Sequence, residues 1–480
     1  MKKEDFPIEI YNKLKGIKPE DYSIDDIFTA ELFIKLYGDR CRYVSDLGVW
    51  YAFDGKRWVV DNKAVITRKY FKQFQRLLCL YAAKDIEDDT KRTVFLENIR
   101  RYAFTKNINY ALSYAESCDP FTVDMFDRNT DLFNCQNGTL NLKTFEFKDH
   151  DPADHLTQIA NCVYDPNASK ELFDKTVNEI CENNEAKKAY LQRMSGYSLT
   201  AEAHLECCFI AYGATTRNGK STFLETINYM MGDYSDTLDP ASLSYDNSAK
   251  KRGSSAAPDI YKLKNKRFVI VREPERRLPL ASSFIKTVTG RDKISARKLY
   301  SNNEIQFQPY CKLWFNTNWK PLINDVTLFT SDRVRIVPFN RHFKESERNK
   351  NLKDELLKPE NLSGVFNWCL EGLKDFRKKG EAVPAEIKQL IKEYEKEENS
   401  VSCFIDEKME CRIDSHSNKP YNSTPLSVFT EYGKWCTANN KSPYGKQRFY
   451  DELRAKGLLR DGNVNGHHYK EVVYGLVLKS

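Results

Sequence analysis

A short segment near the middle of the chain carries the residue types that bind a nucleoside triphosphate. It follows the apolar run 209–212 and leads into the apolar-patterned segment 223–227, an order that predicts a strand, a loop and a helix. In such a loop, successive backbone N–H groups surround the phosphates, and the helix N-terminus adds its positive dipole end. The candidate phosphate-binding residues are Ala214, Thr215, Thr216, Arg217, Asn218, Gly219, Lys220, Ser221 and Thr222.

Two side chains of this loop have defined roles in the prediction. Lys220 is expected to reach the β- and γ-phosphates of ATP, and Ser221 is expected to ligate Mg²⁺. The motif is relaxed at its start, because Ala214 stands where the first glycine is usual and Gly213 lies one residue too early. The prediction of a nucleotide site therefore also depends on residues further along the chain.

Two of the following apolar strands end in polar groups that ATP hydrolysis could use. An acid is needed near Mg²⁺ and the attacking water. Glu273, with Glu275 two residues later, follows the strand predicted at 267–272, and Glu273 is also the expected metal ligand. An amide after the next strand could contact the γ-phosphate, where Asn318 is preferred over Asn316. The acids could instead be surface residues after a buried strand.

Arginines precede the last apolar strand of this region, at 334–339. An arginine inserted from a neighbouring subunit would stabilise charge in the transition state of phosphoryl transfer. Arg333 is preferred for this role over Arg335. Either side chain could instead form a salt bridge at the surface.

A basic segment between the second and third of these strands predicts a long hairpin. Residues 286–300 lead into a turn at 301–304, and residues 305–308 return as a strand. Basic side chains bind phosphates, and an aromatic ring can stack on a base. An ordinary exposed hairpin is the alternative. The candidate DNA-contacting residues here are Lys293, Arg297, Lys298 and Tyr300.

Taken in chain order, these segments resemble the superfamily III helicases, specifically the helicase half of phage, plasmid and poxvirus-type primase–helicases. The matching motifs are N-G-K-S-T at 218–222, the strand leading to Glu273, K-x-x-T-G-x-D at 286–292 with A-R-K-L-Y at 296–300, L-W-F-N-T-N at 313–318 and R-V-R-I-V-P-F at 333–339. Upstream, N-G-T-L-N-L at 137–142 resembles the domain that precedes such cores. Downstream, residues 425–480 resemble the C-terminal winged helix of the family.

The resemblance implies an AAA+-type core in a hexameric ring, with ATP between subunits and hairpins facing a central DNA channel. It assigns Glu273 as the Walker B acid, Asn318 as sensor 1 and Arg333 as the arginine finger. Two departures stand out. Residues 214–217 read Ala-Thr-Thr-Arg where relatives are often glycine-rich, and Asp332 stands where relatives often have a second arginine.

The whole chain is predicted to be an α/β protein with an AAA+-like P-loop core and a parallel sheet. The alternation of strand and helix in the middle of the chain favours this class. We expect a mixed α+β N-terminal domain at 1–165, a helical connector at 166–200, the ATPase core at 201–345, a helical subdomain and linker at 346–412, and a winged-helix domain at 425–480.

The C-terminal segment has many basic residues. A winged helix would set one helix, near 446–456, in a DNA groove, while a wing near 463–469 contacts the backbone. Lys446 and Arg448 are the candidate contacts to duplex DNA, for example that of a replication origin. Alternatively, this winged helix could bind another protein and not DNA. The basic residues of this segment are Lys434, Lys441, Lys446, Arg448, Arg454, Lys456 and Lys470.

Composition sets broad limits. The net charge of +7, from 75 basic and 68 acidic residues, permits nucleic acid as a partner without requiring it. The 13 cysteines form no C-x-x-C pair, and no apolar stretch approaches the ~20 residues of a membrane span. We expect a cytoplasmic protein of a bacterial host cell, with free thiols and no membrane partner. No D-x-D pair precedes the motif at 137–142, so we expect no primase domain.

The predicted function is that of an ATP-dependent DNA helicase or replication initiator of a phage or mobile genetic element. Its cofactors would be ATP and Mg²⁺, and its partners single-stranded DNA in the channel and further copies of itself in a homohexamer. One alternative is an ATP-dependent DNA-binding remodelling switch without processive unwinding, which only an unwinding assay separates from a helicase. Another is a P-loop enzyme such as a nucleotide kinase, which needs no basic hairpin, arginine finger or winged helix.

Overall fold

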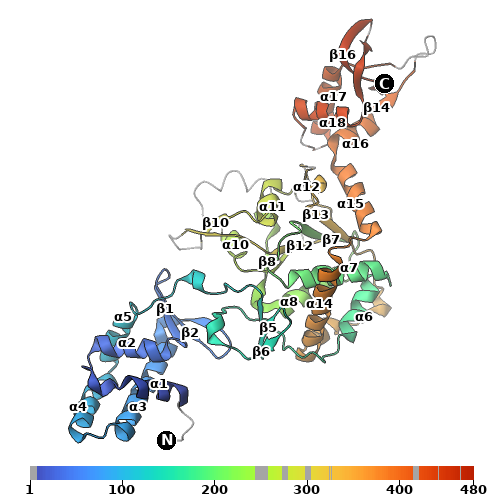
Figure 1. The fold of residues 1–480 in the computed structure, drawn as a ribbon. Helices are drawn as coiled ribbons and strands as arrows, with labels where there is room; N and C mark the ends of the chain where they lie inside the picture. Colours follow the sequence, from blue (N-terminus) through green and yellow to red (C-terminus); the bar gives the residue numbers. More distant parts are fainter. Residues whose placement is uncertain are drawn as a thin grey trace. The chain divides into compact units, whose positions relative to one another are not determined.

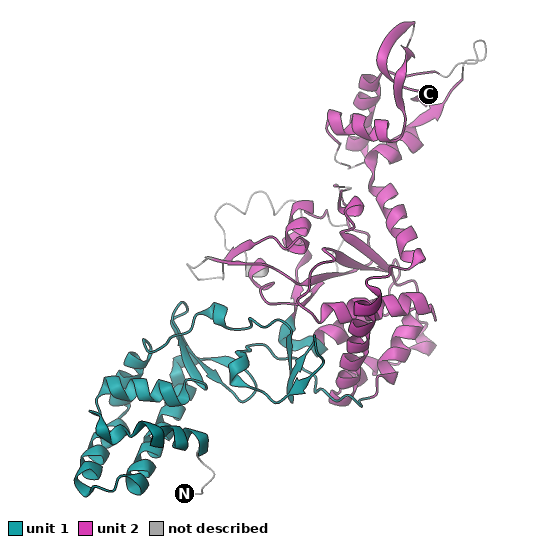
Figure 2. Ribbon diagram, in the orientation of Figure 1, with its two compact units in different colours: residues 1–168, 230–234 teal, residues 169–229, 235–480 magenta. Residues whose placement is uncertain are grey.

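The chain forms two compact units, which Figure 2 shows in separate colours. Unit 1 comprises residues 1–168 and 230–234, and unit 2 comprises residues 169–229 and 235–480. The computed structural model describes residues 8–243, 258–272, 279–297, 304–323, 325, 327–413, 421–439, 441, 443–464 and 466–479.

Unit 1 begins with the helices drawn in blue in Figure 1, and these helices share one aromatic core. Phe33, Phe71 and Phe74 are fully buried in it, and their ring centroids lie 5.1 to 5.6 Å apart. Acidic residues start two of the helices: Asp25 accepts a hydrogen bond from a backbone N–H of the first turn, and Asp88 does the same. The helices are α1 (Ile8–Ile17), α2 (Asp26–Tyr37), α3 (Val65–Asp85), α4 (Asp89–Arg100) and α5 (Thr105–Ala115).

Two small antiparallel sheets complete the first part of unit 1. The dipeptides Asp54-Gly55 and Asn137-Gly138, which favour tight turns, lie at the turns of two hairpins. The first sheet contains β1 (Cys41–Val44), β2 (Val49–Phe53) and β3 (Trp58–Asp61), and the second contains β4 (Leu132–Cys135), β5 (Gly138–Asn141) and β6 (Phe147–Lys148).

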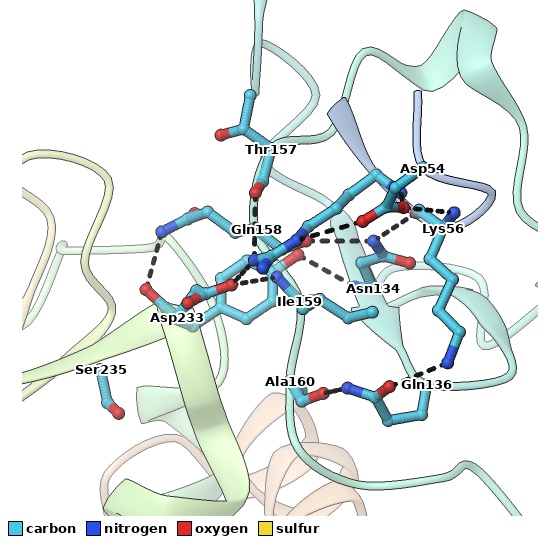
Figure 3. A network of polar contacts seen from close by, with 12 residues as sticks. Asp54, Lys56, Asn134, Gln136, Thr157, Gln158, Ile159, Ala160, Asp233 and Ser235 are labelled. Atoms are coloured by element: carbon cyan, nitrogen blue, oxygen red, sulfur yellow. Dashed lines mark hydrogen bonds and ion pairs between the residues drawn. The ribbon is translucent and has the colours of Figure 1, made fainter. Parts of the chain in front are cut away.

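The segment Met230–Tyr234 belongs to unit 1 although it lies far along the chain, and its Asp233 takes part in the polar network of Figure 3. The buried ring of Tyr234 stacks on Phe133 with centroids 4.5 Å apart, and its hydroxyl accepts a hydrogen bond of 3.0 Å from the backbone N–H of Asn134. The Asp233 carboxylate pairs with Arg57. The sequence gives no signal for this arrangement, because these partners are about a hundred residues or more apart.

Unit 2 is built on a five-stranded, all-parallel sheet in the order β13-β7-β12-β9-β8. Four of these strands lie where the apolar runs predict them. The fifth, β8, was missed because its sequence, SDTL, has little apolar content. The strands are β7 (Cys208–Tyr212), β8 (Ser235–Leu238), β9 (Phe268–Val271), β12 (Lys312–Thr317) and β13 (Val334–Pro338).

Side chains alternate between the two faces of this sheet. On one face, Trp314 of β12 stacks on Phe209 of β7 at 4.5 Å and lies near Phe223 of the following helix at 6.3 Å. On the other face, Leu313 and Phe315 join a separate apolar cluster. Both faces are therefore covered, as a parallel sheet requires.

Helices surround the sheet, and two of them are tied by polar contacts. Arg193 of α7 forms an ion pair of 3.0 Å with Asp375 of α14, and Gln192 donates to the backbone oxygen of Trp368 at 3.1 Å. The helices are α6 (Glu171–Ile180), α7 (Glu185–Ser198), α8 (Lys220–Met231), α10 (Pro258–Tyr261), α11 (Ser282–Thr289), α12 (Thr327–Thr330), α13 (Leu352–Leu356), α14 (Pro359–Lys379) and α15 (Ala385–Glu398), and a hairpin is formed by β10 (Ile294–Arg297) and β11 (Glu304–Phe307).

The C-terminal part of unit 2 combines helices with a two-stranded hairpin. Tyr432 and Phe449 pack at its centre with ring centroids 4.6 Å apart. Its elements are α16 (Ser400–Lys408), β14 (Met409–Cys411), α17 (Pro425–Ala438), α18 (Lys446–Ala455), β15 (Leu459–Val464), β16 (His467–Val473) and β17 (Leu476–Leu478). Over the described part of the chain, no helix has the length and apolar character needed to cross a membrane.

Candidate nucleotide-binding site

The predicted phosphate loop lies at the carboxyl end of β7, and α8 begins at its Lys220. Strand β7 lies between β13 and β12, so the carboxyl ends of three parallel strands meet around the loop. Ligands of open α/β sheets bind outside this edge. The position is the one that a nucleotide site requires.

The loop has two residues in the left-handed region, Arg217 with φ 60° and Gly219 with φ 84°. A Cβ on Gly219 would lie 2.5 Å from the Cγ1 atom of Ile180, so only glycine fits there. A Cβ on Gly213 would lie 2.5 Å from the backbone oxygen of Phe339. Gly213, which precedes the usual glycine position of the motif by one residue, therefore allows close packing at the start of the loop.

Lys220 is 4% exposed, and its amine contacts two polar groups of the described residues. Nζ donates to the backbone oxygen of Gly213 at 3.2 Å and to Oδ1 of Asn318 at 2.6 Å. These oxygens compensate the burial of the charge. The structure thus brings together the predicted phosphate-binding lysine and the preferred amide residue, which are 98 positions apart in sequence.

The alternative amide, Asn316, contacts the neighbouring loop residue. Its Nδ2 donates to Oγ of Ser221 at 3.1 Å. Its Oδ1 is buried and has no hydrogen-bond partner among the described residues. A buried oxygen without a donor, beside a hydroxyl group, suits a hydrated Mg²⁺, which binds oxygen ligands and keeps several waters. The residues present therefore fit the predicted metal.

The two predicted acids, Glu273 and Glu275, lie outside the described residues. Strand β9 ends at Val271, paired in parallel with Phe315 of β12, so it ends at the same edge of the sheet as the loop. No group of three or more His, Cys, Asp or Glu side chains that could hold a metal occurs within the described ranges.

Arg333 lies near the amino ends of the parallel strands, whereas the phosphate loop of its own chain lies at their carboxyl ends. It directly precedes the amino end of β13, where Val334 is in register with Cys208, whereas the loop follows the carboxyl end of β7. Its guanidinium forms an ion pair of 2.8 Å with Glu206 and donates to Oγ1 of Thr289 at 2.8 Å. Arg333 therefore cannot reach the phosphates bound by its own chain.

The other candidate arginine, Arg335, is 7% exposed and forms an ion pair of 2.6 Å with Glu381. Burial disfavours its charge, but the hydrogen bond and the charge of Glu381 raise the pKa of Arg335 above its usual value. This side chain is committed to a structural ion pair within its own chain.

The structure confirms a hairpin within the predicted basic segment, with Ile294 opposite Phe307 and Arg297 opposite Glu304. The hairpin is shorter than predicted, because residues 286–289 belong to helix α11 and the first strand begins only at Ile294. Lys293 is exposed directly before β10. The side chain of Arg297, and the residues Lys298 and Tyr300, lie outside the described part of the structure.

The two C-terminal candidates differ in their surroundings. Lys446 is exposed at the first position of α18. The Arg448 guanidinium stacks on the Tyr444 ring at 3.9 Å and lies 3.8 Å from a carboxylate oxygen of Asp325. Burial opposes the charge of Asp325, but hydrogen bonds from Lys286 and a neighbouring threonine outweigh it and lower the pKa of that carboxyl group. Arg448 would have to leave this anion to contact DNA.

Two further residues contact the loop and were missed in the sequence. Nδ1 of His342 lies 2.9 Å from the backbone oxygen of Thr216, and the N–H of Phe343 donates to the backbone oxygen of Arg217 at 2.9 Å. Both follow β13, so the chain after this strand supports the outer side of the loop. No motif marks them, because their backbone contacts depend on the fold and not on a pattern of residue types.

Comparisons with known proteins agree with a helicase-like chain. Residues 30–182 match the family model described as D5 N terminal like, and residues 211–333 match a family of unknown function. A putative helicase of Acanthamoeba polyphaga mimivirus, L207/L206, is 24% identical over 90% of this chain and 48% of its own length. The putative helicase 121R of Invertebrate iridescent virus 3 is 21% identical over 90% of this chain and 52% of its own length.

A shorter match is the putative helicase V13 of Sputnik virophage, 25% identical over 50% of this chain and 34% of its own length. The chain thus spans about half, or less, of these curated relatives. Among solved structures, the apo structure of the NrS-1 C terminal region has 14% identity and a TM-score of 0.41, covering 66% of this chain and 77% of that one. Over most of its length the chain is similar to D5-type putative helicases of large DNA viruses.

Proposed function

We propose that this chain is the motor of an ATP-dependent DNA helicase that serves the replication of a virus, phage or mobile genetic element. The observation that carries the proposal is the 2.6 Å contact between Lys220 and Asn318 at the carboxyl edge of the parallel sheet. It joins a phosphate-loop lysine to an amide at the end of the adjacent strand. The sheet order β13-β7-β12-β9-β8 supports the AAA+-type core that the sequence resemblance implies.

In this proposal Lys220 exchanges the backbone oxygen of Gly213 for the phosphates of ATP, and Asn318 stays within reach of the γ-phosphate. Ser221 and the free oxygen of Asn316 would hold Mg²⁺ or its water ligands, and the metal would neutralise charge on the phosphates. Glu273 is assigned the Walker B role. The chain's own contribution is to position these groups before ATP arrives, which lowers the reorganisation needed for hydrolysis.

The placement of Arg333 supports a site shared between subunits. An arginine at the far edge of the sheet can act only on ATP bound by another copy of the chain, as expected in a hexameric ring. The hairpin β10–β11 would then contact single-stranded DNA in the channel. The helices and hairpin of the C-terminal part are assigned to a winged helix that binds duplex DNA, with Lys446 as its contact.

The test compares Lys220→Ala with a control, Lys175→Ala, which removes an exposed lysine of α6. ATP hydrolysis and separation of a forked DNA duplex are measured for both. Lys220→Ala is expected to lose both activities, because a loop without its lysine cannot neutralise the phosphates, and the control is expected to keep them. Strand separation by the Lys220→Ala protein would contradict the mechanism. DNA-stimulated hydrolysis by the unmodified protein without strand separation would instead identify a remodelling switch.

A further inference from the structure

Unit 1 contains a concentration of positive charge that the proposed motor does not use. The segments 62–84 and 98–115 include nine basic residues and no acidic ones. The whole chain has a net charge of +7, so the residues outside these two segments are slightly acidic in sum. The nine are Lys63, Arg68, Lys69, Lys72, Arg76, Lys84, Arg100, Arg101 and Lys106.

Three of these residues form an exposed stripe on α3. Lys69, Lys72 and Arg76 follow one another at intervals of three and four, which places them on one face of the helix. The opposite face carries Phe71 and Phe74 into the core. None of the three cations has a carboxylate oxygen within 4.0 Å among the described residues. Their charge is therefore not neutralised by an ion pair within the described part of the chain.

Helix α5 presents aromatic rings on its exposed face. Lys106, Tyr110 and Tyr114 are spaced by four residues, and the two tyrosines are 48% and 47% exposed. Phe104, just before the helix, is 69% exposed. Nζ of Lys106 lies 5.6 Å from the centroid of the Tyr110 ring. Exposed rings beside a cation, with no acidic residue in the segment, are suited to stacking on the bases of a nucleic acid.

The two helices are joined at this surface. Nε of Arg68 on α3 donates to Oδ1 of Asn109 on α5 at 3.1 Å. A cavity of about 320 Å³ opens at the same place, and its wall includes both of these residues and Lys63 together with the acidic residues Asp61 and Glu116. Arg68 directly precedes Lys69, and Asn109 directly precedes Tyr110, so this contact connects the helix that carries the basic stripe to the helix that carries the aromatic face.

We propose that this region binds single-stranded DNA. The site, here termed the α3–α5 face, consists of Lys69, Lys72 and Arg76 on α3 and of Lys106, Tyr110 and Tyr114 on α5. The cations would bind phosphates while the tyrosine rings stack on bases, which are accessible in a single strand and not in a duplex. The proposal goes beyond the motor function, because unit 1 contains none of the predicted ATP-site residues.

The charge is tested by fluorescence anisotropy with labelled oligothymidylate, using the full chain with Lys220→Ala so that no ATP is hydrolysed. The double substitution Lys69→Ala/Lys72→Ala is compared with Lys143→Ala/Lys175→Ala, which removes two other exposed lysines. The first is expected to weaken binding about tenfold and to reduce the slope of log K against log salt by about 1.4, from ~0.7 per phosphate contact. The second is expected to change little. Equal effects of the two would overturn the proposal.

Stacking is tested with Tyr110→Ala/Tyr114→Ala against Tyr110→Phe/Tyr114→Phe. The alanines are expected to weaken binding at least fivefold with an unchanged salt slope, and the phenylalanines to keep affinity, because only the ring is needed. Equal losses of single-strand affinity in the alanine and phenylalanine variants, or no loss in either, would overturn the proposal. Loss of unwinding is measured separately, so the motor proposal and this one can fail independently.

Discussion

Asn316 and Asn318 lie two residues apart along β12 and its carboxyl end, and each contacts a different residue of the phosphate loop. Asn318 accepts from the Lys220 amine, and Asn316 donates to the Ser221 hydroxyl. Side chains two residues apart along a strand project to the same side of the sheet. In the proposed site, Asn318 would therefore act at the phosphates and Asn316 at the metal.

This division predicts different kinetic effects for the two amides. Asn318→Ala is expected to lower kcat for ATP hydrolysis about a hundredfold with little change in KM, because the amide acts where charge develops. Asn316→Ala is expected to raise the Mg²⁺ concentration needed for half-maximal rate. Steady-state ATPase measurements with Mg²⁺ titration test both. A metal effect from Asn318→Ala and none from Asn316→Ala would refute the assignment.

Lys312, at the amino end of β12, makes stability depend on pH. It is 2% exposed, and burial, with a smaller effect from the charge of Arg267, lowers its pKa from 10.5 to about 7. The unfolded chain therefore binds more protons than the folded one above pH 7, so the free energy of unfolding should rise with pH from there towards 10.5.

The increase in the free energy of unfolding is best measured by urea unfolding between about pH 7 and 8.5. Above that range the thiols of the unfolded chain also begin to lose protons. Lys312→Met removes the titrating group and should show a smaller increase over this interval than the unmodified chain. Lys175→Met, at an exposed position, is the matched control and should keep the full increase. Identical pH profiles for Lys312→Met and the unmodified chain would contradict the predicted shift.

At the scale of elements, segment Met230–Tyr234 links the end of α8 to the fold of unit 1. Tyr234 is 1% exposed and packs on Phe133, whereas Tyr229, in the same helix region, is 46% exposed. Tyr234→Ala is expected to destabilise unit 1 by about 3–5 kcal/mol, the usual cost of removing a buried ring. Tyr229→Ala should cost less than about 0.5 kcal/mol. Hydrogen exchange in β4 and β5 would locate the effect, and equal protection in both variants would disprove it.

The sequence predicts elements well where residue patterns are local. The apolar runs reveal four strands of the parallel sheet, and turn residues reveal the hairpins β2–β3 and β4–β5. Strand β8 is not predicted from the sequence, because its residues, SDTL, show no apolar pattern. The contacts of Asp233, His342 and Lys312 also escape, because each depends on partners brought together by tertiary structure. The motifs predict that Lys220 and Asn318 lie in the same site, but they do not predict the distance between the two side chains.

At the scale of the whole molecule, one copy of the chain holds two parts of the proposed site at opposite edges of a sheet. The phosphate loop follows the carboxyl end of β7, and Arg333 precedes the amino end of β13. Joining the two requires a head-to-tail contact between copies, and such a contact can close into a ring. Within one copy, Glu206 neutralises Arg333 with an ion pair of 2.8 Å, which a neighbouring nucleotide would have to replace.

A mixing experiment tests this arrangement. Lys220→Ala and Arg333→Ala should each abolish ATP hydrolysis alone, but an equal mixture should regain activity. In random rings of the two variants, about a quarter of the interfaces pair an intact loop with an intact arginine, so roughly that share of the rate is expected. A mixture as inactive as its components would show that the arginine does not act between copies. Glu206→Gln, which releases Arg333 without removing it, is the control and should remain active alone.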